Sequence, residues 1–391
     1  MLALFTAILP ILAAPVQESN VGAKKYIVGL KDNLDVESHI QWVSDIHARS
    51  LSRRDTAGVE KTLEIGTFHA YTGEFDQDTI AQVKENPNVA FVEEDEEQTR
   101  AIVTQNDAPW GIASLSVPSL PNGNTLGQKY TYDSTAGAGT FVYVFDTGVT
   151  TNNTEFEGRA IKGFTPWVEE EFIDFFGHGT HVAGIIGSKT FGVAKKATIY
   201  DVKVARGVGY ATGGKVLEGI EWAVKNATGT PGRAAKSVIN VSLALPFSQA
   251  LNQGFAAAYA SGVLSIVGAA NDGKVASGKS PASEPTAITV GAVDWQKNAA
   301  EWSNFGPLVD IFAPGVDIPS LWNTEGRVAT VSGTSMASPH VAGLAAYLQG
   351  KEDLNTPAKA TQRILELARK GEIKTNRPNT ANVLAYHGAG A

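Results

Sequence analysis

The sequence predicts an α/β protein: a mostly parallel β-sheet with helices on both faces, preceded by a small α+β domain. The chain has 391 residues, more than the roughly 250–300 that one domain usually holds. Residues 1–100 carry 9 basic and 17 acidic side chains, whereas residues 101–391 carry 23 of each, which places a boundary near residue 100. Beyond that boundary, continuous apolar runs alternate with helical segments, as buried parallel strands do.

The small α+β domain is expected between about residues 24 and 95 of the segment 15–100. The segments that predict it are strand 25–30, helix 36–50, a strand pair within 62–75, helix 76–86 and strand 89–92. The two strands of the pair are expected to join near residues 71–73. This β-α-β-β-α-β order is typical of a ferredoxin-like fold, and the acidic run at residues 93–97 predicts a solvated linker after it.

The larger domain is expected to cover residues 101–391. Its predicted strands are 141–145, 199–204, 238–241, 263–267 and 287–290. Its predicted helices are 179–187, 215–226, 249–260, 336–349 and 357–370. In a parallel sheet of this kind, the active site forms at the carboxyl ends of the strands.

Composition excludes several classes of function. The chain has no cysteine, so a thiol nucleophile, a Cys-bound zinc and disulfides are all excluded. It lacks the basic surface that a nucleic-acid partner would require. Residues 1–14 are apolar, too short to span a bilayer and end in small residues, so they resemble a secretory signal peptide. A buried N-terminal segment is the alternative, and no other apolar run is long enough for a membrane helix.

Three short motifs hold the candidate catalytic residues. Asp146 ends a predicted strand and is followed by Thr-Gly, although such an Asp taken alone is more often a turn or cap residue. Gly177–Gly184 reads GHGTHVAG, in which His178 and His181 are either a metal pair or one general base and one structural histidine. A zinc site would need a third protein ligand, and the Glu of an HExxH motif is absent. Ser335 begins a predicted helix, where positive charge density favours a nucleophile, although ordinary capping is the simpler explanation for a lone serine.

Taken together, the three motifs favour a catalytic role over these simpler explanations, because Asp, His and Ser occur in the chain order of the subtilisins. The motifs DTG at 146–148, GHGTHVAG at 177–184 and GTSMASPHVAG at 333–343 resemble the signatures of the subtilisin-like serine proteases. Segments similar to the proteinase K branch are APWGIAS (108–114), TEFEGRA (154–160), GVAKKA (192–197), SPASEP (280–285) and SNFGPLVDIFAPG (303–315). Residues 24–95 resemble the inhibitory propeptide of the same family.

The resemblance implies a subtilisin-like fold and a role for each matching residue. Ser335 would be the nucleophile, His178 the general base and acid, and Asp146 the residue that orients the imidazole, with His181 structural. Asn271 and the backbone N–H of Ser335 would form the oxyanion hole. The implied protein is a secreted, monomeric serine endopeptidase, made as a zymogen that its own propeptide inhibits until cleavage between about residues 98 and 103. Its partners would be protein or peptide substrates, with no nucleic acid and no membrane.

The substrate would pair with two edge segments, of which the first includes Gly209 and Ala211. The second comprises Ser242, Leu243 and Ala244. The family shows Ser-Leu-Gly-Gly and Ala-Ala-Gly-Asn where this chain has SLAL at 242–245 and GAAN at 268–271, and Ala211 stands where glycine is usual. Methyl groups at Ala244 and Ala270, with Ala269 beside the latter, predict either a narrowed primary pocket or a backbone shift that absorbs them.

Chemistry of this type requires no cofactor, but the resemblance implies a structural Ca²⁺ site. Its ligands would be Asp310 and the carbonyl oxygens of Pro285 and Ala287, an oxygen set that suits a hard cation. Two alternatives to an active protease remain at this point. One is a binding protein of the same fold with an obstructed cleft, and the other is a metallohydrolase built on His178 and His181.

Overall fold

The computed structural model describes residues 24–32, 34–50, 56–95, 101–119, 123, 126–207, 209–375 and 377–388. The expected signal peptide and residues 98–100 of the expected cleavage region lie outside this part of the chain. The chain divides into two compact units, one within residues 1–99 and one within residues 100–391.

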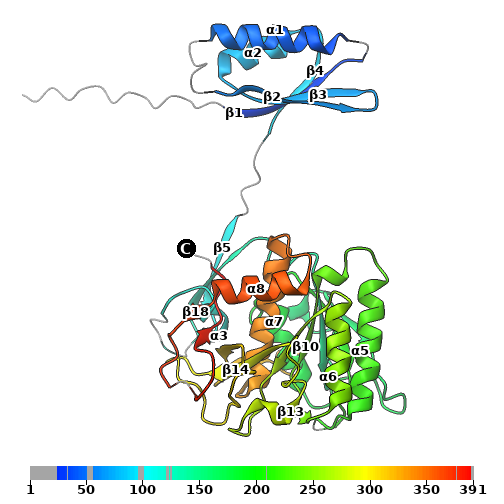
Figure 1. Ribbon diagram of the computed structural model, residues 1–391, viewed down its shortest axis with the longest axis vertical. Helices are drawn as coiled ribbons and strands as arrows, with labels where there is room; N and C mark the ends of the chain where they lie inside the picture. Colours follow the sequence, from blue (N-terminus) through cyan, green and yellow to red (C-terminus); the bar gives the residue numbers. More distant parts are fainter. Residues whose placement is uncertain are drawn as a thin grey trace, which may run out of the picture. The chain divides into compact units, whose positions relative to one another are not determined.

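The smaller unit is an antiparallel sheet of four strands with two helices on one face (Figure 1). Its elements are β1 Lys24–Leu30, α1 Val36–Arg49, β2 Gly58–Ile65, β3 Phe68–Phe75, α2 Gln77–Glu85 and β4 Val89–Glu94. The strand order is β2-β3-β1-β4, so the predicted ferredoxin-like arrangement is confirmed. Val28, Val43 and Val83 are fully buried between the sheet and the helices. Asp35 and Asp76 cap the two helices with their side chains.

The predicted position of the turn in this unit is wrong. The β2–β3 hairpin turns at Gly66, where φ is +62° and glycine is therefore favoured. Gly73 lies inside β3, opposite Val59, and a side chain there would collide with the Gly58 carbonyl. Its glycine therefore serves close packing between strands, which a sequence cannot distinguish from a turn.

The larger unit contains a sheet with strand order β18-β19-β15-β14-β12-β10-β7-β9-β8. The strands are β7 Phe141–Asp146, β8 Ala160–Phe164, β9 Thr198–Lys203, β10 Ser237–Val241, β12 Leu264–Gly268, β14 Ile288–Val293, β15 Ile311–Pro314, β18 Arg369–Lys370 and β19 Val383–Leu384. All neighbouring pairs are parallel except β18–β19. In this sheet β8 and β9 lie on one side of β7, and β10 lies on the other side. The strand order therefore reverses direction at β7, which favours a site at the carboxyl ends of β7 and β10.

Helices cover both faces of this sheet, as predicted (Figure 1). They are α3 Trp110–Ser114, α4 His178–Gly187, α5 Gly213–Thr228, α6 Gln249–Ala260, α7 Thr334–Lys351 and α8 Pro357–Leu367. Alternate residues of β7 face opposite cores: Val142 and Val144 pack in the core of α4 and α7, whereas Tyr143 and Phe145 pack with α5 and α6. This two-sided burial explains why the strand has apolar or aromatic side chains from Phe141 to Phe145.

Three short two-stranded ladders complete the unit. They pair β5 Ile102–Ala108 with β6 Gln128–Asp133, β11 Leu245–Pro246 with β13 Lys279–Ser280, and β16 Ile318–Leu321 with β17 Val328–Val331. The predicted helix 357–370 is too long, because α8 ends at Leu367 and residues 369–370 join the edge of the main sheet. No helix in the described residues is long and apolar enough to cross a membrane.

Candidate active site

Asp146 is the last residue of β7 and is fully buried. Its Oδ1 accepts a hydrogen bond of 2.7 Å from the backbone N–H of Thr147. The same oxygen lies 2.7 Å from Nδ1 of His178, the first residue of α4. The carboxylate therefore fixes one ring nitrogen of His178 and leaves the other nitrogen available for a partner outside the pair.

Glycines allow the Asp146 and His178 loops to approach each other. Gly177 has φ +106°, and a side chain there would collide with the indole of Trp322. A side chain at Gly179 would collide with the carbonyl of Gly148 in the DTG segment. Gly177 is therefore required by the close approach of an indole ring, and Gly179 by the close approach of a backbone carbonyl.

Asp174 holds these two loops together, and sequence analysis did not single it out. Its Oδ1 accepts from the Thr147 hydroxyl at 2.9 Å and from Gly177 N at 2.8 Å. Its Oδ2 accepts from Thr180 N at 3.0 Å and from the Thr180 hydroxyl at 2.6 Å. A buried aspartate three residues before a GHG motif could have been found only by asking what caps the helix.

The environment of His178 favours a protonated imidazole. Burial of the ring lowers its pKa. The charge of Asp146 and the hydrogen bond to it raise the pKa by more than burial lowers it, with a smaller contribution from Asp174. The net effect is a pKa above the ordinary value of 6.5. The side chain stays 18% exposed, so the ring can reach a substrate.

His181 lies in a different environment, although it is only three residues away on α4. It is fully buried, and its Nε2 donates toward the carbonyl oxygens of Ile318 at 3.0 Å and Ala329 at 3.1 Å. Burial, aided by the nearby His178, lowers its pKa to about 4. A neutral histidine that joins α4 to β16 and β17 is a packing residue. No group of three or more His, Cys, Asp or Glu that could hold a metal occurs among the described residues.

Ser335 lies in the first turn of α7, directly after Thr334, which begins the helix, and Gly333, whose backbone is extended. Its hydroxyl donates to the carbonyl oxygen of Ser242 at 3.1 Å. Backbone N–H groups in a first helical turn lack intrahelical acceptors and carry the positive end of the helix dipole. The Ser335 position therefore combines a hydroxyl with a donor that can stabilise negative charge.

Asn271 is aligned with this donor by Thr334. The Oδ1 of Asn271 accepts from both the backbone N–H and the hydroxyl of Thr334, each at 2.9 Å. This orients the amide so that Nδ2 faces outward. A methyl group placed on Gly333 would lie 3.5 Å from Asn271 Nδ2 and 3.6 Å from Ser335 N, so the two N–H donors flank one small space.

A pocket opens beside Ser335 and Asn271, and we call it the primary pocket. It is lined by Ser242, Leu243, Ala244, Gly268, Ala270, Asn271, Asp272, Lys279, Thr334 and Ser335. Ala270 has φ +81°, a conformation that favours glycine, which agrees with the glycine expected there in the family pattern. Ala269 is fully buried in an apolar cluster with Val293 and Phe312 and does not line this pocket, so the expectation for it is wrong.

A second hollow continues from the primary pocket past His178. It is lined by Phe176, His178, Gly209, Ala211, Ser242, Leu243, Ala244 and Leu245. The two segments expected to pair with substrate therefore lie across one groove from each other. Phe176 is exposed and lines this hollow with His178, and it was not predicted, because its aromatic character alone gives no indication of such a position.

The proposed metal ligands lie at the amino ends of adjacent strands. Asp310 precedes β15, and Pro285 and Ala287 precede β14. The Asp310 carboxylate accepts from Thr289 N at 2.8 Å, and burial raises its pKa to about 6. Among the described residues, no ion pair involves this carboxylate. A desolvated carboxylate without a cationic side chain beside it fits a hard cation such as Ca²⁺.

The site thus has the parts of a serine hydrolase: a buried carboxylate bonded to a histidine, a serine at a helix start and an amide donor beside it. The sequence pattern of the Subtilase family matches residues 137–390, and that of Peptidase inhibitor I9 matches residues 25–100. The chain belongs to the subtilase family and carries an I9-type propeptide domain.

Relatives support this assignment over the whole length. Alkaline protease 1 of Aspergillus clavatus is 45% identical, covering 99% of this chain and 98% of that protein. The alkaline proteinase of Hapsidospora chrysogena is also 45% identical, with the same coverage. The crystal structure of a cold adapted subtilisin-like serine proteinase has 38% identity and a TM-score of 0.66, covering 72% of this chain and 98% of that chain. The chain is therefore a subtilisin-like serine endopeptidase.

Proposed function

We propose that Asp146, His178 and Ser335 form the catalytic triad of this endopeptidase. The 2.7 Å contact between His178 Nδ1 and Asp146 Oδ1 is the observation that carries the proposal. On substrate binding, the Ser335 hydroxyl turns from the Ser242 carbonyl toward Nε2 of His178, which accepts its proton as Oγ attacks the scissile carbonyl. His178 then donates that proton to the leaving amine, and water hydrolyses the resulting acyl-enzyme by the same route.

Asn271 and Ser335 stabilise the negative charge that develops during attack. The amide Nδ2 of Asn271 and the backbone N–H of Ser335 donate to the oxyanion. Because Thr334 already holds the Asn271 amide in place, this donor requires little reorganisation during the reaction.

The primary pocket receives the substrate residue before the scissile bond. Ala244 and Ala270 line it with methyl groups where the family pattern has bare backbone. These methyl groups narrow the pocket and disfavour bulky aromatic residues. Gly209 and Ala211 on one side and Ser242 to Ala244 on the other hold the substrate backbone.

The smaller unit acts as an intramolecular inhibitor. Its match to Peptidase inhibitor I9 supports a zymogen that becomes active after cleavage near residues 98–103. The apolar residues 1–14 and the acidic smaller unit favour a secreted, monomeric protein whose partners are protein substrates, with no membrane or nucleic-acid partner.

A calcium ion bound by Asp310, Pro285 and Ala287 stabilises the larger unit and takes no part in the chemistry. Removal of a ligand that binds only the folded state lowers stability by RT ln(1 + [L]/Kd), about 2.7 kcal/mol at a hundredfold excess over Kd. We therefore expect a strong chelator to lower the thermal midpoint by several degrees, and to have no effect on Asp310→Asn. Equal midpoints with and without chelator in the unchanged protein would contradict the site.

Digestion of a denatured-peptide library, with every cut mapped by mass spectrometry, tests the proposed function. The full chain is expressed, allowed to process itself, and compared with Ser335→Ala. Abundant cuts that disappear in Ser335→Ala are expected, with few aromatic residues before the cut. An absence of cuts from a protein shown to lack residues 1–100 would instead favour a binding protein with an obstructed cleft.

A further inference from the structure

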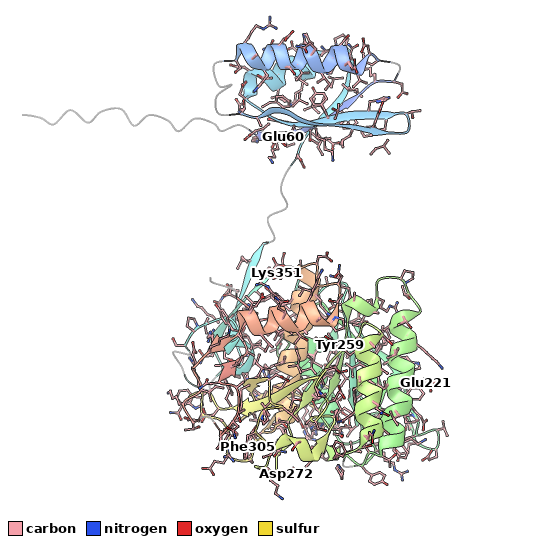
Figure 2. The ribbon with its side chains drawn as sticks, in the orientation of Figure 1. Glu60, Glu221, Tyr259, Asp272, Phe305 and Lys351 are labelled. Carbon is pink, nitrogen blue, oxygen red and sulfur yellow. The ribbon has the colours of Figure 1, made fainter. Side chains whose placement is uncertain are left out.

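Lys203 is a buried lysine beside Asp146 that the proposed mechanism does not use. Side chains fill the space between the sheet and the helices of the larger unit (Figure 2), and Lys203, the last residue of β9, is 1% exposed. It is the only lysine or arginine among the described residues that is less than 2% exposed. In the register of the main sheet it lies opposite Asp146. A buried ammonium is unfavourable unless acceptors surround it, so its partners indicate its role.

The ammonium group of Lys203 joins two backbone segments. Its Nζ donates to the carbonyl oxygen of Thr147 at 2.7 Å and to that of Ala205 at 3.2 Å. The backbone N–H of Ala205 in turn donates to the carbonyl oxygen of Asp146 at 3.0 Å. These three hydrogen bonds tie two consecutive carbonyl groups, those of Asp146 and Thr147, to the segment that ends β9.

Thr147 connects this arrangement to the side chain of Asp146. The N–H of Thr147 donates to Asp146 Oδ1 at 2.7 Å, and the same oxygen lies 2.7 Å from His178 Nδ1. The Thr147 hydroxyl donates to Asp174 Oδ1 at 2.9 Å, and its carbonyl oxygen accepts from Lys203. A rotation of the Thr147 backbone would therefore move the N–H that orients the Asp146 carboxylate.

The residue after Thr147 does not restrict such a rotation. Gly148 has φ +114° and no side chain, so the carbonyl group of Thr147 depends on an outside partner for its direction. Lys203 is that partner. It is a stronger donor than a neutral side chain, because hydrogen bonds from charged groups are shorter and stronger than those between neutral groups.

The contacts of Lys203 favour a role in fixing the backbone over a role as an ion pair. Nζ lies 3.9 Å from Glu170 Oε2, well beyond its distance to the Thr147 carbonyl oxygen. Burial lowers the pKa of Lys203, and nearby carboxyl groups, among which Glu170 has the largest effect, oppose this shift. The closest contact is thus made with a carbonyl group of the Asp146 loop.

We propose that Lys203 is a positioning residue for catalysis: by fixing the carbonyl group of Thr147, it holds the Asp146 carboxylate against the histidine. The lysine itself takes no part in proton transfer. This inference rests on the proposed function, because it requires the Asp146 carboxylate to act through His178 on Ser335.

Steady-state kinetics on one fluorogenic peptide test the proposal with Lys203→Met, which keeps the length of the side chain and removes its donors. Each full chain is allowed to process itself, and a chain that does not is cleaved by tagged unchanged protein, which is then removed. We expect kcat to fall by about 100-fold, because small displacements of reacting groups are costly. KM should change by less than about threefold, since the lost contact orients the catalytic group and does not bind substrate.

Lys195→Met is the matched control. Lys195 is also buried, and its Nζ donates to the carbonyl oxygens of Lys189 at 2.9 Å and Thr190 at 3.5 Å. It precedes the amino end of β9, whereas Lys203 stands at the carboxyl end, where the site lies. The two variants should lower the thermal midpoint by similar amounts, but Lys195→Met should leave kcat unchanged.

A second variant and a second measurement keep the test independent of one substitution. The donor of Lys203→Gln is one bond shorter and should also lower kcat strongly, so this variant serves should Lys203→Met not fold. In either variant, Ser335 should react with a serine-directed phosphonate more slowly by about the factor that kcat loses. Intact-mass spectrometry follows this reaction and distinguishes the variant from any remaining unchanged protein.

The outcomes separate this inference from the proposed function. An unchanged kcat in folded Lys203→Met or Lys203→Gln, or an equal loss in Lys195→Met, would overturn the inference and leave the protease intact. A rise in KM with unchanged kcat would assign Lys203 to substrate binding and also overturn it. Failure of the unchanged protein to cut any peptide, together with no reaction of Ser335 with the phosphonate, would overturn both.

Discussion

The proposed catalytic residues and the primary pocket share one edge of the sheet, but they are held in different ways. Asp146, His178 and Asn271 are fixed by hydrogen bonds of 2.7–2.9 Å to buried or backbone partners. The pocket beside them is shaped by two alanine methyl groups and by an ion pair between Lys279 and Asp272 that stays partly exposed. The proposed chemistry therefore depends on an aspartate, a histidine and an asparagine held by short hydrogen bonds, with the Ser335 hydroxyl as the group that turns. The proposed selectivity depends on side chains that can be exchanged without disturbing the fold.

The largest effect should follow from loss of the nucleophile. Ser335→Ala should lower turnover by about a millionfold, because the histidine and aspartate have no function without the hydroxyl. Progress curves with a fluorogenic peptide measure the loss. Ser338→Ala is the matched control, since Ser338 is buried one turn further along α7 and bonds to Ser242 Oγ at 3.0 Å. Comparable losses in both variants would show that packing, and not nucleophilicity, explains the effect.

Asp146→Asn should lower turnover by about 10⁴-fold while leaving the fold intact. Activity requires neutral His178, whose pKa is raised, so kcat/KM of the unchanged protein should rise with pH through a midpoint above 6.5. Without the carboxylate, burial is opposed only by the smaller contribution of Asp174, and the midpoint should move to lower pH. A pH–rate profile whose midpoint does not move would mean that Asp146 does not control the protonation of His178.

Asn271→Leu should reduce kcat by about 100–1,000-fold with little change in KM, because the amide donates mainly in the transition state. Initial rates over a range of substrate concentrations separate the two constants. The loss should exceed any effect of changing the pocket alanines, since the oxyanion donor belongs to the rigid part of the site. A rise in KM with unchanged kcat would place Asn271 in substrate binding instead.

Ala270→Gly should have the smallest effect on chemistry and a clear effect on selectivity. Removal of the methyl group should raise kcat/KM for Phe relative to Ala before the scissile bond by about tenfold. Because φ is +81°, glycine also relieves backbone strain, and the free energy of unfolding should change by less than about 1 kcal/mol. Comparable rates on Phe and Ala in the unchanged protein would show that the backbone has absorbed the methyl group.

The sequence predicted the rigid part of the site better than the pocket. The motifs around Asp146, His178 and Ser335 are long. Their glycines lie at positions where close contacts require glycine, so the sequence pattern alone indicates these loops. Asp174 was missed because a buried aspartate that ties two loops together has no local pattern. Lys279 was missed because it reaches the pocket through the β11–β13 ladder, a two-residue pairing between segments more than thirty residues apart.

In the fold, too, features with a local sequence pattern were predicted better than features that depend on contact with a distant segment. Strands such as Phe141–Asp146 are apolar on both faces and were predicted to within a residue or two. Features that depend on contact with another segment were not, including the glycine inside β3, the end of α8 and the buried position of Ala269.

Reaction with a serine-directed phosphonate, followed by peptide mapping, tests whether Asp146 and His178 activate Ser335. We expect one modified residue, Ser335, and a labelling rate that rises with pH through a midpoint above 6.5 and collapses in Asp146→Asn. Labelling of another serine, or a Ser335 that reacts equally well without the Asp146 carboxylate, would contradict it.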